Sequence, residues 1–326
     1  MADARREWAV NAVLAALLLA VPVAALWLDE PFYITLATRV AILALAGVGL
    51  NLALGLGGMV SFGHAAFFGV GGYVAGIMAS HAFSGQPMVF GLQGSNQMLV
   101  IWAVAMAITG VMAAGIGALS LRTSGVYFIM ITLAFAQMVY FFALGWPAYG
   151  GDDGLPIFLR NQFPGLNTAQ IWDLFLLCYG VLLVVLGLFA MLQHSRFGVA
   201  LQAIRQNPTR AAAVGISPFG VRLVAFVLSG MITGLAGAMM ADLTRFVSPS
   251  MLAWQMSGEL IVIIILGGVG RLFGPVAGAG ILVAFEVFFG GLTQHWQLWL
   301  GLVLLAVVLF ARGGLIGLIA GPARHV

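Results

Sequence analysis

The sequence predicts an all-α polytopic membrane protein with about ten transmembrane helices. Hydrophobic residues make up 62% of the 326 residues and charged residues only 7%, whereas a soluble globular domain carries about 25% charged residues. The apolar residues also gather into runs close to the length of about 20 residues that a spanning helix needs. These observations exclude a water-soluble fold, and we expect residues 1–326 to form a single transmembrane domain.

Ten apolar runs follow one another along the chain, at 9–28, 32–56, 61–80, 98–120, 123–146, 171–193, 217–241, 256–270, 274–290 and 296–311. The first run is long for a signal peptide, and no small-residue cleavage site precedes Asp29, so we expect a retained helix. Glycines interrupt the third run, and the eighth is short for a full crossing. Either of these two is therefore expected to be broken or re-entrant.

The basic residues are unusual, because all 13 are arginine and the chain has no lysine. A Walker-type phosphate loop and a serine-lysine nucleophile pair both require lysine, as does a pyridoxal site, so these are excluded. If the protein uses ATP, another chain binds it.

The arginines also predict the orientation in the membrane. Alternating the ten runs from a cytoplasmic amino terminus places ten of the 13 arginines on the cytoplasmic side, as the positive-inside rule requires. These ten are Arg5, Arg6, Arg122, Arg196, Arg205, Arg210, Arg222, Arg271, Arg312 and Arg324. We therefore expect both termini in the cytoplasm, and no nucleic-acid partner for this net charge.

Motifs for catalysis or metal binding are absent from the sequence. Cys178 is the only cysteine, the five histidines are scattered, and neither H-E-x-x-H nor G-x-S-x-G occurs. We expect no catalytic residue, no metal site and no cofactor bound by this chain.

Three ionisable residues fall inside predicted spans, where charge is costly and calls for a partner or a role. At about 1.5 Å per residue, Arg39, Glu259 and Glu286 reach similar depths in the outer half of the membrane. We expect Arg39 to pair with Glu286 or Glu259 near the external mouth of a translocation path. A structural ion pair is favoured over a direct contact with substrate.

Glycine clusters interrupt two of the runs, at Gly57 and Gly58 and again at Gly267 and Gly268. Close helix packing is one interpretation, because small residues let helices approach in a bilayer. The other is that these breaks expose helix ends to the substrate path. A faint repeat between 57–69 and 267–280 favours a translocation core built from duplicated halves.

Polar and aromatic residues beside these breaks complete the predicted path or gate. Ser61 and His64 follow the first break, near the cytoplasmic end of the run, where we favour a packing or hydrogen-bonding histidine over a proton relay. Trp254 is expected to anchor at the membrane interface. The alternative is that Trp254, beside Ser257 and Glu259, lines the external gate.

Three loops are long. Residues 81–97 and 147–170 are polar and external in this topology, and they are expected to offer a docking face. Residues 194–216 are cytoplasmic, and Ala200, Leu201, Ala203 and Ile204 form a short apolar stripe before Asn207-Pro208 ends the helix. A short amphipathic helix under the membrane is the predicted structure of the third loop.

Four stretches of the sequence resemble the LivM-type membrane subunit of bacterial ABC importers for branched-chain amino acids: residues 49–76, 121–138, 200–239 and 246–279. The resemblance implies a type II ABC importer-like fold, with 194–216 as the segment that couples to the ATP-binding subunit. The residues that match the coupling motif are Ala203, Ile204, Arg205, Asn207, Pro208 and Gly215. The sequence departs from the family pattern at Ala212, Arg222 and Arg210.

The same resemblance implies the partners and the substrate class. The segment Trp254, Ser257, Gly258 and Glu259 is similar to LivM rather than to its sister subunit, so a LivH-like second permease is expected. Two cytoplasmic ATP-binding subunits, which use ATP, and a periplasmic substrate-binding protein complete the expected importer in a bacterial inner membrane. The substrate is a branched-chain or related amino acid, although the scaffold also serves urea, amides and aromatic acids. An ion-coupled secondary transporter that uses Arg39, Glu259 or Glu286 is the alternative from another class.

Overall fold

The computed structural model describes residues 2–87, 93–292, 295–310 and 313–320. Its longer helices are α1 (Ala2–Trp27), α2 (Pro31–Asn51), α3 (His64–Ser84), α4 (Met98–Ser120), α5 (Val126–Leu144), α6 (Ile171–His194), α7 (Arg196–Gln206), α9 (Pro218–Thr244), α10 (Trp254–Gly267), α11 (Gly274–Gly290) and α12 (Trp296–Phe310). The shorter elements are η1 (Leu52–Leu56), η3 (Pro147–Tyr149), α8 (Pro208–Ala213), η4 (Pro249–Leu252), α13 (Gly314–Ala320) and the strands β1 (Leu155–Pro156) and β2 (Phe246–Val247). Arg312 and Arg324, whose predicted side is cytoplasmic, lie outside the described residues.

Every predicted apolar run contains a helix, and the chain is a multi-pass membrane protein. Within the described residues, eight helical segments are long and apolar enough to cross a bilayer, whereas α10 and α11 are shorter. The run at 61–80 is a continuous helix, α3, and its glycine break lies before it, at 57–63. The run at 256–270 forms the short helix α10, which ends at Gly267, and whether it crosses fully remains a prediction.

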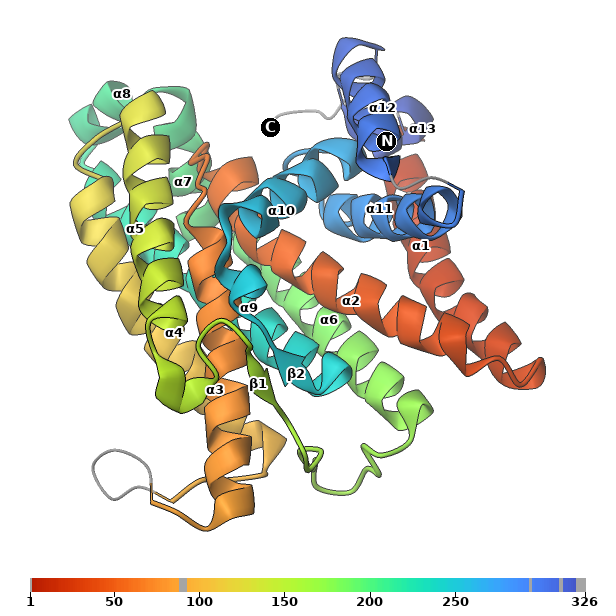
Figure 1. Cartoon of the computed structure of the whole chain (residues 1–326). Coiled ribbons are helices and arrows are strands. Elements are labelled where there is room, and N and C mark those ends of the chain that lie inside the picture. Colours follow the sequence, from red (N-terminus) through yellow and green to blue (C-terminus); the bar gives the residue numbers. More distant parts are fainter. Residues whose placement is uncertain (1, 88–92, 293–294, 311–312, 321–326) are drawn as a thin grey trace.

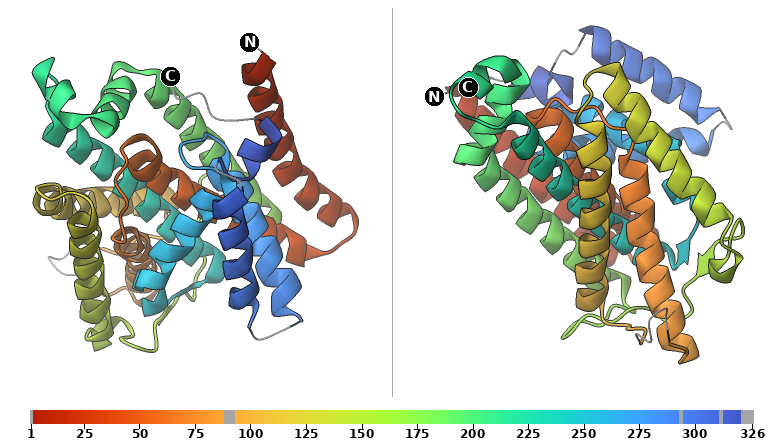
Figure 2. Two further views of the ribbon diagram at one scale, coloured as in Figure 1. Left: turned by 90° about the horizontal axis from the view of Figure 1, so that it is seen from above. Right: turned by 90° about the vertical axis from the view of Figure 1, so that its left-hand side faces the viewer.

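The core forms around α9, which packs against α2, α3 and α4 (Figure 1). Residues 41–50 of α2 are buried on every side, so α2 is an internal helix rather than a lipid-facing one. Glycine makes the close approach of α3 and α9 possible, since a Cβ at Gly237 would lie 1.7 Å from the carbonyl oxygen of Phe68. Figure 2 shows α3, α4 and α5 running side by side on the outside of this core.

The chain between α9 and α10 enters the molecule as the short strand β2 and the short helix η4, without forming an α-helix. It runs back along α3. A Cβ added at Gly76 of α3 would touch the Val247 side chain, and a Cβ added at Gly69 would touch Leu252. Ser257 in the first turn of α10 then reaches Ala65 at the start of α3. The irregular backbone of this segment is covered by α3, which suits a chain buried within a membrane protein.

The two ends of the molecule carry different elements. The helices α7 and α8, the start of α1 and the helix α13 lie at one end (Figure 1). The last turns of α3 and the chain that leads into α6 lie at the opposite end.

Candidate translocation and coupling site

The first helix break follows α2, whose last turn widens into the π-helix η1. Such π-turns inside helices are rare and often mark functional sites. Asn51 precedes the π-helix and is fully buried, although an amide in an apolar span is costly unless it is hydrogen-bonded. Gly58 then turns the chain with φ of 67°, a conformation that glycine adopts without steric cost.

The second break lies between α10 and α11, and the Asn51 amide binds it directly. Asn51 Nδ2 donates to the carbonyl oxygen of Arg271 at 2.9 Å, and its Oδ1 accepts from the backbone N–H of Gly270 at 2.9 Å. The two breaks touch as well, since a Cβ at Gly55 would lie 2.7 Å from Cα of Gly270. The two predicted glycine clusters therefore meet, about 220 residues apart in sequence.

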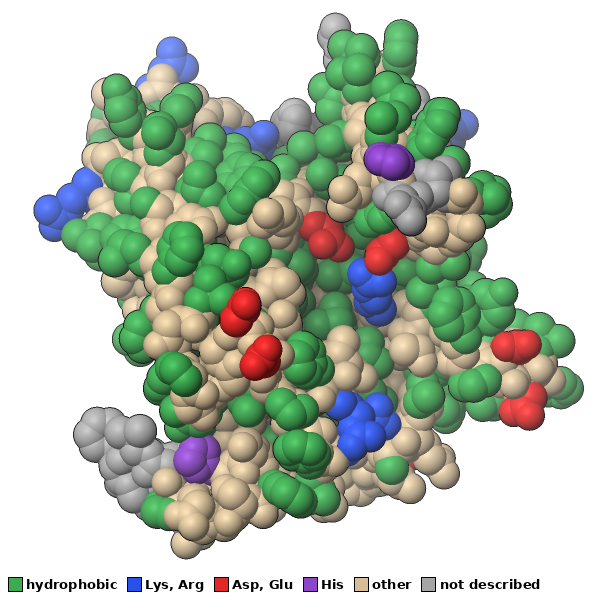
Figure 3. Space-filling view, in the orientation of Figure 1, with side chains coloured by type: hydrophobic (Ala, Val, Ile, Leu, Met, Phe, Trp, Pro, Cys, Tyr) green, Lys and Arg blue, Asp and Glu red, His purple; other side chains and the backbone are tan. Residues whose placement is uncertain are grey.

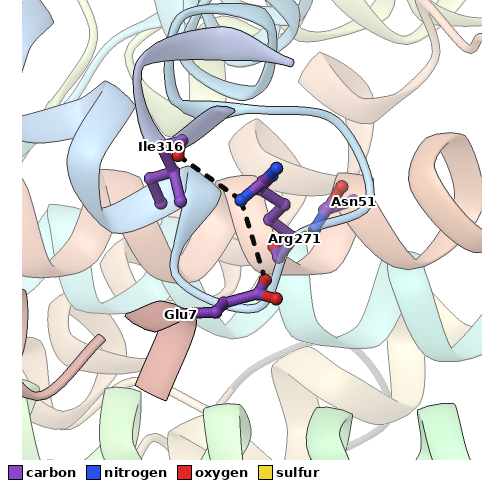
Figure 4. A network of polar contacts seen from close by, with 4 residues as sticks. All are labelled: Glu7, Asn51, Arg271 and Ile316. Atoms are coloured by element: carbon purple, nitrogen blue, oxygen red, sulfur yellow. Dashed lines mark hydrogen bonds and ion pairs between the residues drawn. The ribbon is translucent and has the colours of Figure 1, made fainter. Parts of the chain in front are cut away.

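A polar network surrounds the second break at its far side (Figure 4). The Arg271 side chain is buried, with 4% of the residue exposed. Its guanidinium lies 3.9 Å from the Glu7 carboxylate of α1 and donates to the carbonyl oxygen of Ile316 in α13 at 3.4 Å. The break is thus held on one side by α2 and on the other by the first and last helices. Gly267 and Gly268 are buried here, so in this structure they pack the loop, and their predicted role in the path remains a prediction.

The helix predicted under the membrane is α7, and Asn207 ends it at the predicted Asn-Pro break. Asn207 also caps α8, because its side chain accepts a hydrogen bond from the backbone of Arg210 at 3.0 Å. Leu201 and Ile204 of the apolar stripe are fully buried, whereas Ala203 is partly buried and Pro208 and Gly215 are exposed.

Arg205 is an exposed residue whose side chain reaches back to the first break. Its guanidinium donates to the carbonyl oxygen of Gly55 at the end of the first break. The helix α7 is therefore bonded to the same junction that holds α2, α10 and α11.

The start of α3 is held by hydroxyl groups from other helices. Ser257 of α10 donates to the carbonyl oxygen of Phe62 and accepts from the backbone N–H of Ala65, both at 2.7 Å. This contact satisfies one of the N–H groups that a helix start leaves unpaired. Ser61 is buried and accepts from the N–H of Gly63 at 3.1 Å.

His64 is a fully buried residue in the first turn of α3. Its Nε2 lies 2.6 Å from Ser229 Oγ, and Ser229 donates to the carbonyl oxygen of Gly49 at 2.5 Å. Because the one hydroxyl proton goes to Gly49, Nε2 of His64 is the donor to Ser229. The contact joins α3, α9 and α2, which fits the favoured packing and hydrogen-bonding role.

The predicted ion pair is present between Arg39 of α2 and Glu286 of α11. Two contacts join them, at 2.8 Å and 3.1 Å, in the bidentate arrangement that arginine and carboxylate favour. The side chains are 35% and 28% exposed, and Figure 3 shows acidic and arginine side chains together beside a recess over α2 and α10. Charged groups at membrane depth do not face lipid, so this face meets protein or water.

Glu259 and Trp254 belong to the first two turns of α10. Glu259 is partly buried near this pair, two residues after Ser257, which contacts the start of α3. Their predicted place at an external mouth or gate remains a prediction. Trp254 is 48% exposed, and the structure records no hydrogen bond of its indole with a described residue.

The loop at 155–170, which was predicted to be external, is fastened to the end of α9 by a buried acid. Asn161 Nδ2 donates to Asp242 Oδ1 at 2.6 Å, and Arg160 donates to the carbonyl oxygen of Thr168 at 2.8 Å. Burial lowers the pKa of Arg160, Arg245 lowers it further, and Asp242 opposes the shift. β1 and β2 pair beside this cluster, so the loop is an ordered surface.

Sequence reasoning missed three buried polar residues: Asn51, Ser229 and Asp242. Asn51 carried a signal, as the one amide in the apolar run at 32–56. Ser229 carried none, because serine is common in membrane helices. Among the described residues, no group of three or more His, Cys, Asp or Glu side chains is placed to hold a metal ion.

Comparison with known proteins agrees with this architecture. The LivM permease of the high-affinity branched-chain amino acid transport system of Escherichia coli (strain K12) is 27% identical over 311 residues, covering 87% of this chain and 69% of the relative. A probable LivH permease of Methanocaldococcus jannaschii is 24% identical over 298 residues, covering 85% of this chain and 89% of the relative. An autoinducer 2 import permease, LsrC, of Yersinia enterocolitica is 26% identical over 167 residues, which is 48% of this chain and 45% of the relative. No solved structure matches the chain.

A family model described as the permease component of branched-chain amino acid transport systems matches residues 32–312. These relatives are transport permeases, and such permeases work together with other transporter subunits. The match spans both helix breaks, the segment α7–α8 and the Arg39–Glu286 pair. The chain therefore belongs to the family of permease components of branched-chain amino acid transport systems.

Proposed function

We propose that this chain is one permease subunit of a bacterial ABC importer that carries branched-chain or related amino acids inward. The observation that carries the proposal is the bond between α7 and the first helix break, in a chain of this family. The helix α7 lies at one end of the molecule and is bonded to the first helix break. This arrangement supports a role for α7 in transmitting movement from an ATP-binding subunit. The chain itself contains no lysine, which supports ATP use by a partner.

The second permease is placed against the face that bears Arg39 and Glu286. A charged pair exposed on a membrane-level surface requires protein or water beside it, and a path between two permeases supplies both. Substrate then passes along this face, and the two glycine breaks lie behind it. The external loops receive a substrate-binding protein, and both termini lie in the cytoplasm with α7 and α8.

The partners and the substrate are tested by purification. A tagged copy of this chain, extracted gently from its native membrane, is expected to bring with it a second permease and two copies of ATP-binding subunits. The associated substrate-binding protein, purified without denaturation, is expected to retain a branched-chain amino acid that mass spectrometry identifies. Isolation of the tagged chain without an ATP-binding subunit would contradict the proposal and favour an ion-coupled transporter. A retained urea, amide or aromatic acid would change the substrate but not the mechanism.

A further inference from the structure

We infer that Arg205 acts inside this chain, as the contact through which the coupling segment moves the helices that carry Arg39, Glu259 and Glu286. The inference rests on the proposed function, because it assumes that an ATP-binding subunit moves α7. The motif alone implies that Arg205 meets that subunit. The structure instead directs its guanidinium to the carbonyl oxygen of Gly55.

The first link is the contact between α7 and the end of α2. The last carbonyl groups of a helix lack intrahelical partners and carry partial negative charge, so the Gly55 carbonyl is a favourable acceptor for a cation. The aliphatic stem of Arg205 also packs on Gly58, where a Cβ would lie 3.0 Å from Arg205 Cγ. Arg205 thus holds both sides of the first break, by one charged hydrogen bond and by packing.

The second link is the Asn51 clamp between the two breaks. The Asn51 amide accepts a hydrogen bond from the N–H of Gly270 and donates one to the carbonyl oxygen of Arg271, both at 2.9 Å. These are consecutive residues of the second break. The direct approach of Gly55 to Gly270 leaves no space between the two loops. A displacement of the first break therefore displaces the second.

The third link is the attachment of α2 to α11 at both ends. Arg39 lies twelve residues before Asn51, and Glu286 lies twelve residues after Gly274 at the start of α11, so each interval spans about 18 Å of helix. Between the two ties the helices touch, because a Cβ at Gly47 would lie 2.9 Å from Cβ of Pro275. The helices α2 and α11 are thus fastened at matching heights, by the Asn51 clamp and by the ion pair.

These three links form one continuous route. It leads from α7 through Gly55 and Asn51 to the loop between α10 and α11, and from there to the charged face. A residue that only stabilised α7 would not need to reach the first break, which the Asn51 side chain joins to the loop between α10 and α11. We assign Arg205 and Asn51 the role of positioning residues on this route.

The test uses the complete importer in liposomes and measures ATP hydrolysis and leucine uptake together. Arg205→Met keeps the apolar stem and removes the donor, so hydrolysis is expected to continue while leucine transported per ATP falls at least about fivefold, as loss of a charged hydrogen bond allows. Arg205→Lys restores a cationic donor and is expected to recover at least half of the ratio. Arg122→Met is the matched control, because Arg122 is exposed in the loop between α4 and α5, and the ratio should not change.

Asn51→Leu provides an independent variant on the same route, with a similar loss of coupling expected. Because both residues act in series, the double variant with Arg205→Met should transport as much leucine per ATP as the more impaired of the two single variants. Two independent sites would instead show losses that add. The unfolding temperature of each complex confirms that it is folded before its ratio is compared.

Three results decide the inference. A normal ratio in Arg205→Met beside an active wild type would overturn it and leave the proposed function intact. Dissociation of the ATP-binding subunit from Arg205→Met would also overturn it, since Arg205 would then face that subunit. A wild-type complex that shows no ATP-driven uptake would instead overturn the proposed function.

Discussion

At the scale of single residues, Arg39 of α2 and Glu286 of α11 form a bidentate ion pair that is about a third exposed. Three ionisable residues in apolar runs demanded partners, and the bidentate contact at 2.8 Å and 3.1 Å supplies one for Arg39. The sequence could not choose between Glu286 and Glu259, because that choice depends on the order in which α2, α10 and α11 pack. The structure leaves Glu259 beside the pair, with the second permease or the path as its proposed neighbour.

Exchanging the charges of this pair distinguishes its two interpretations. Arg39→Glu alone places two acids side by side and is expected to reduce uptake at least about tenfold, because like charges in a site shielded from bulk water repel strongly. The double variant Arg39→Glu, Glu286→Arg restores the pair with its polarity reversed, and a structural pair predicts recovery to at least about a third of wild-type uptake. Radiolabelled leucine uptake with matched expression is the measurement. Failure of the double variant, with the complex still assembled, would mean that Arg39 contacts substrate directly.

Asn51 shows where reasoning from residues ends. An amide within an apolar run signals a buried hydrogen-bond partner, because an unpaired amide is costly there. Its partners, Gly270 and Arg271, are about 220 residues away, and no local pattern specifies them. The faint repeat between the two glycine clusters was the one signal that they belong together.

At the scale of elements, hydropathy located the long helices well. It did not predict the irregular segment between α9 and α10. The segment between α9 and α10 contains β2 and η4, and it packs along α3 through Gly69 and Gly76. A window of about 20 residues averages over such a segment, so Glu259 was assigned a depth measured from an outer helix end. The contact of Ser257 with the start of α3 could not be predicted from such a window.

The external loop is the element whose order is easiest to measure. Trypsin cleaves after lysine and arginine, and with no lysine in the chain the predicted external sites are Arg160 and Arg245. Asp242→Ala leaves the Asn161 amide without its 2.6 Å partner, so local opening of the loop should rise and cleavage after Arg160 should accelerate about tenfold. The fragment is followed by mass spectrometry after trypsin is added outside intact spheroplasts.

Asp152→Ala is the matched control, because Asp152 is an exposed acid in the same loop region. Its cleavage rate should equal that of the wild type. Equal rates for Asp242→Ala and the wild type would show that the buried acid does not hold the loop.

At the scale of the whole molecule, two helix breaks connect the face that bears Arg39 and Glu286 to the helix α7 at one end. Composition alone predicted the membrane class, since that class follows from counts that packing does not alter. The arrangement of the breaks required the structure, because it depends on contacts between distant glycines. Membership of the permease family then connects this route to ATP-driven import.

The central claim is that force reaches this chain from ATP hydrolysed elsewhere, and one measurement tests it most directly. Liposomes carry this chain, the second permease and the ATP-binding subunits, with ATP enclosed on the side of α7 and leucine-loaded binding protein on the other. We predict leucine accumulation that requires ATP, stops when the ATP-binding subunit is inactivated, and does not occur with this chain alone under a proton or sodium gradient. Leucine accumulation by this chain alone under such a gradient, without ATP, would contradict the account.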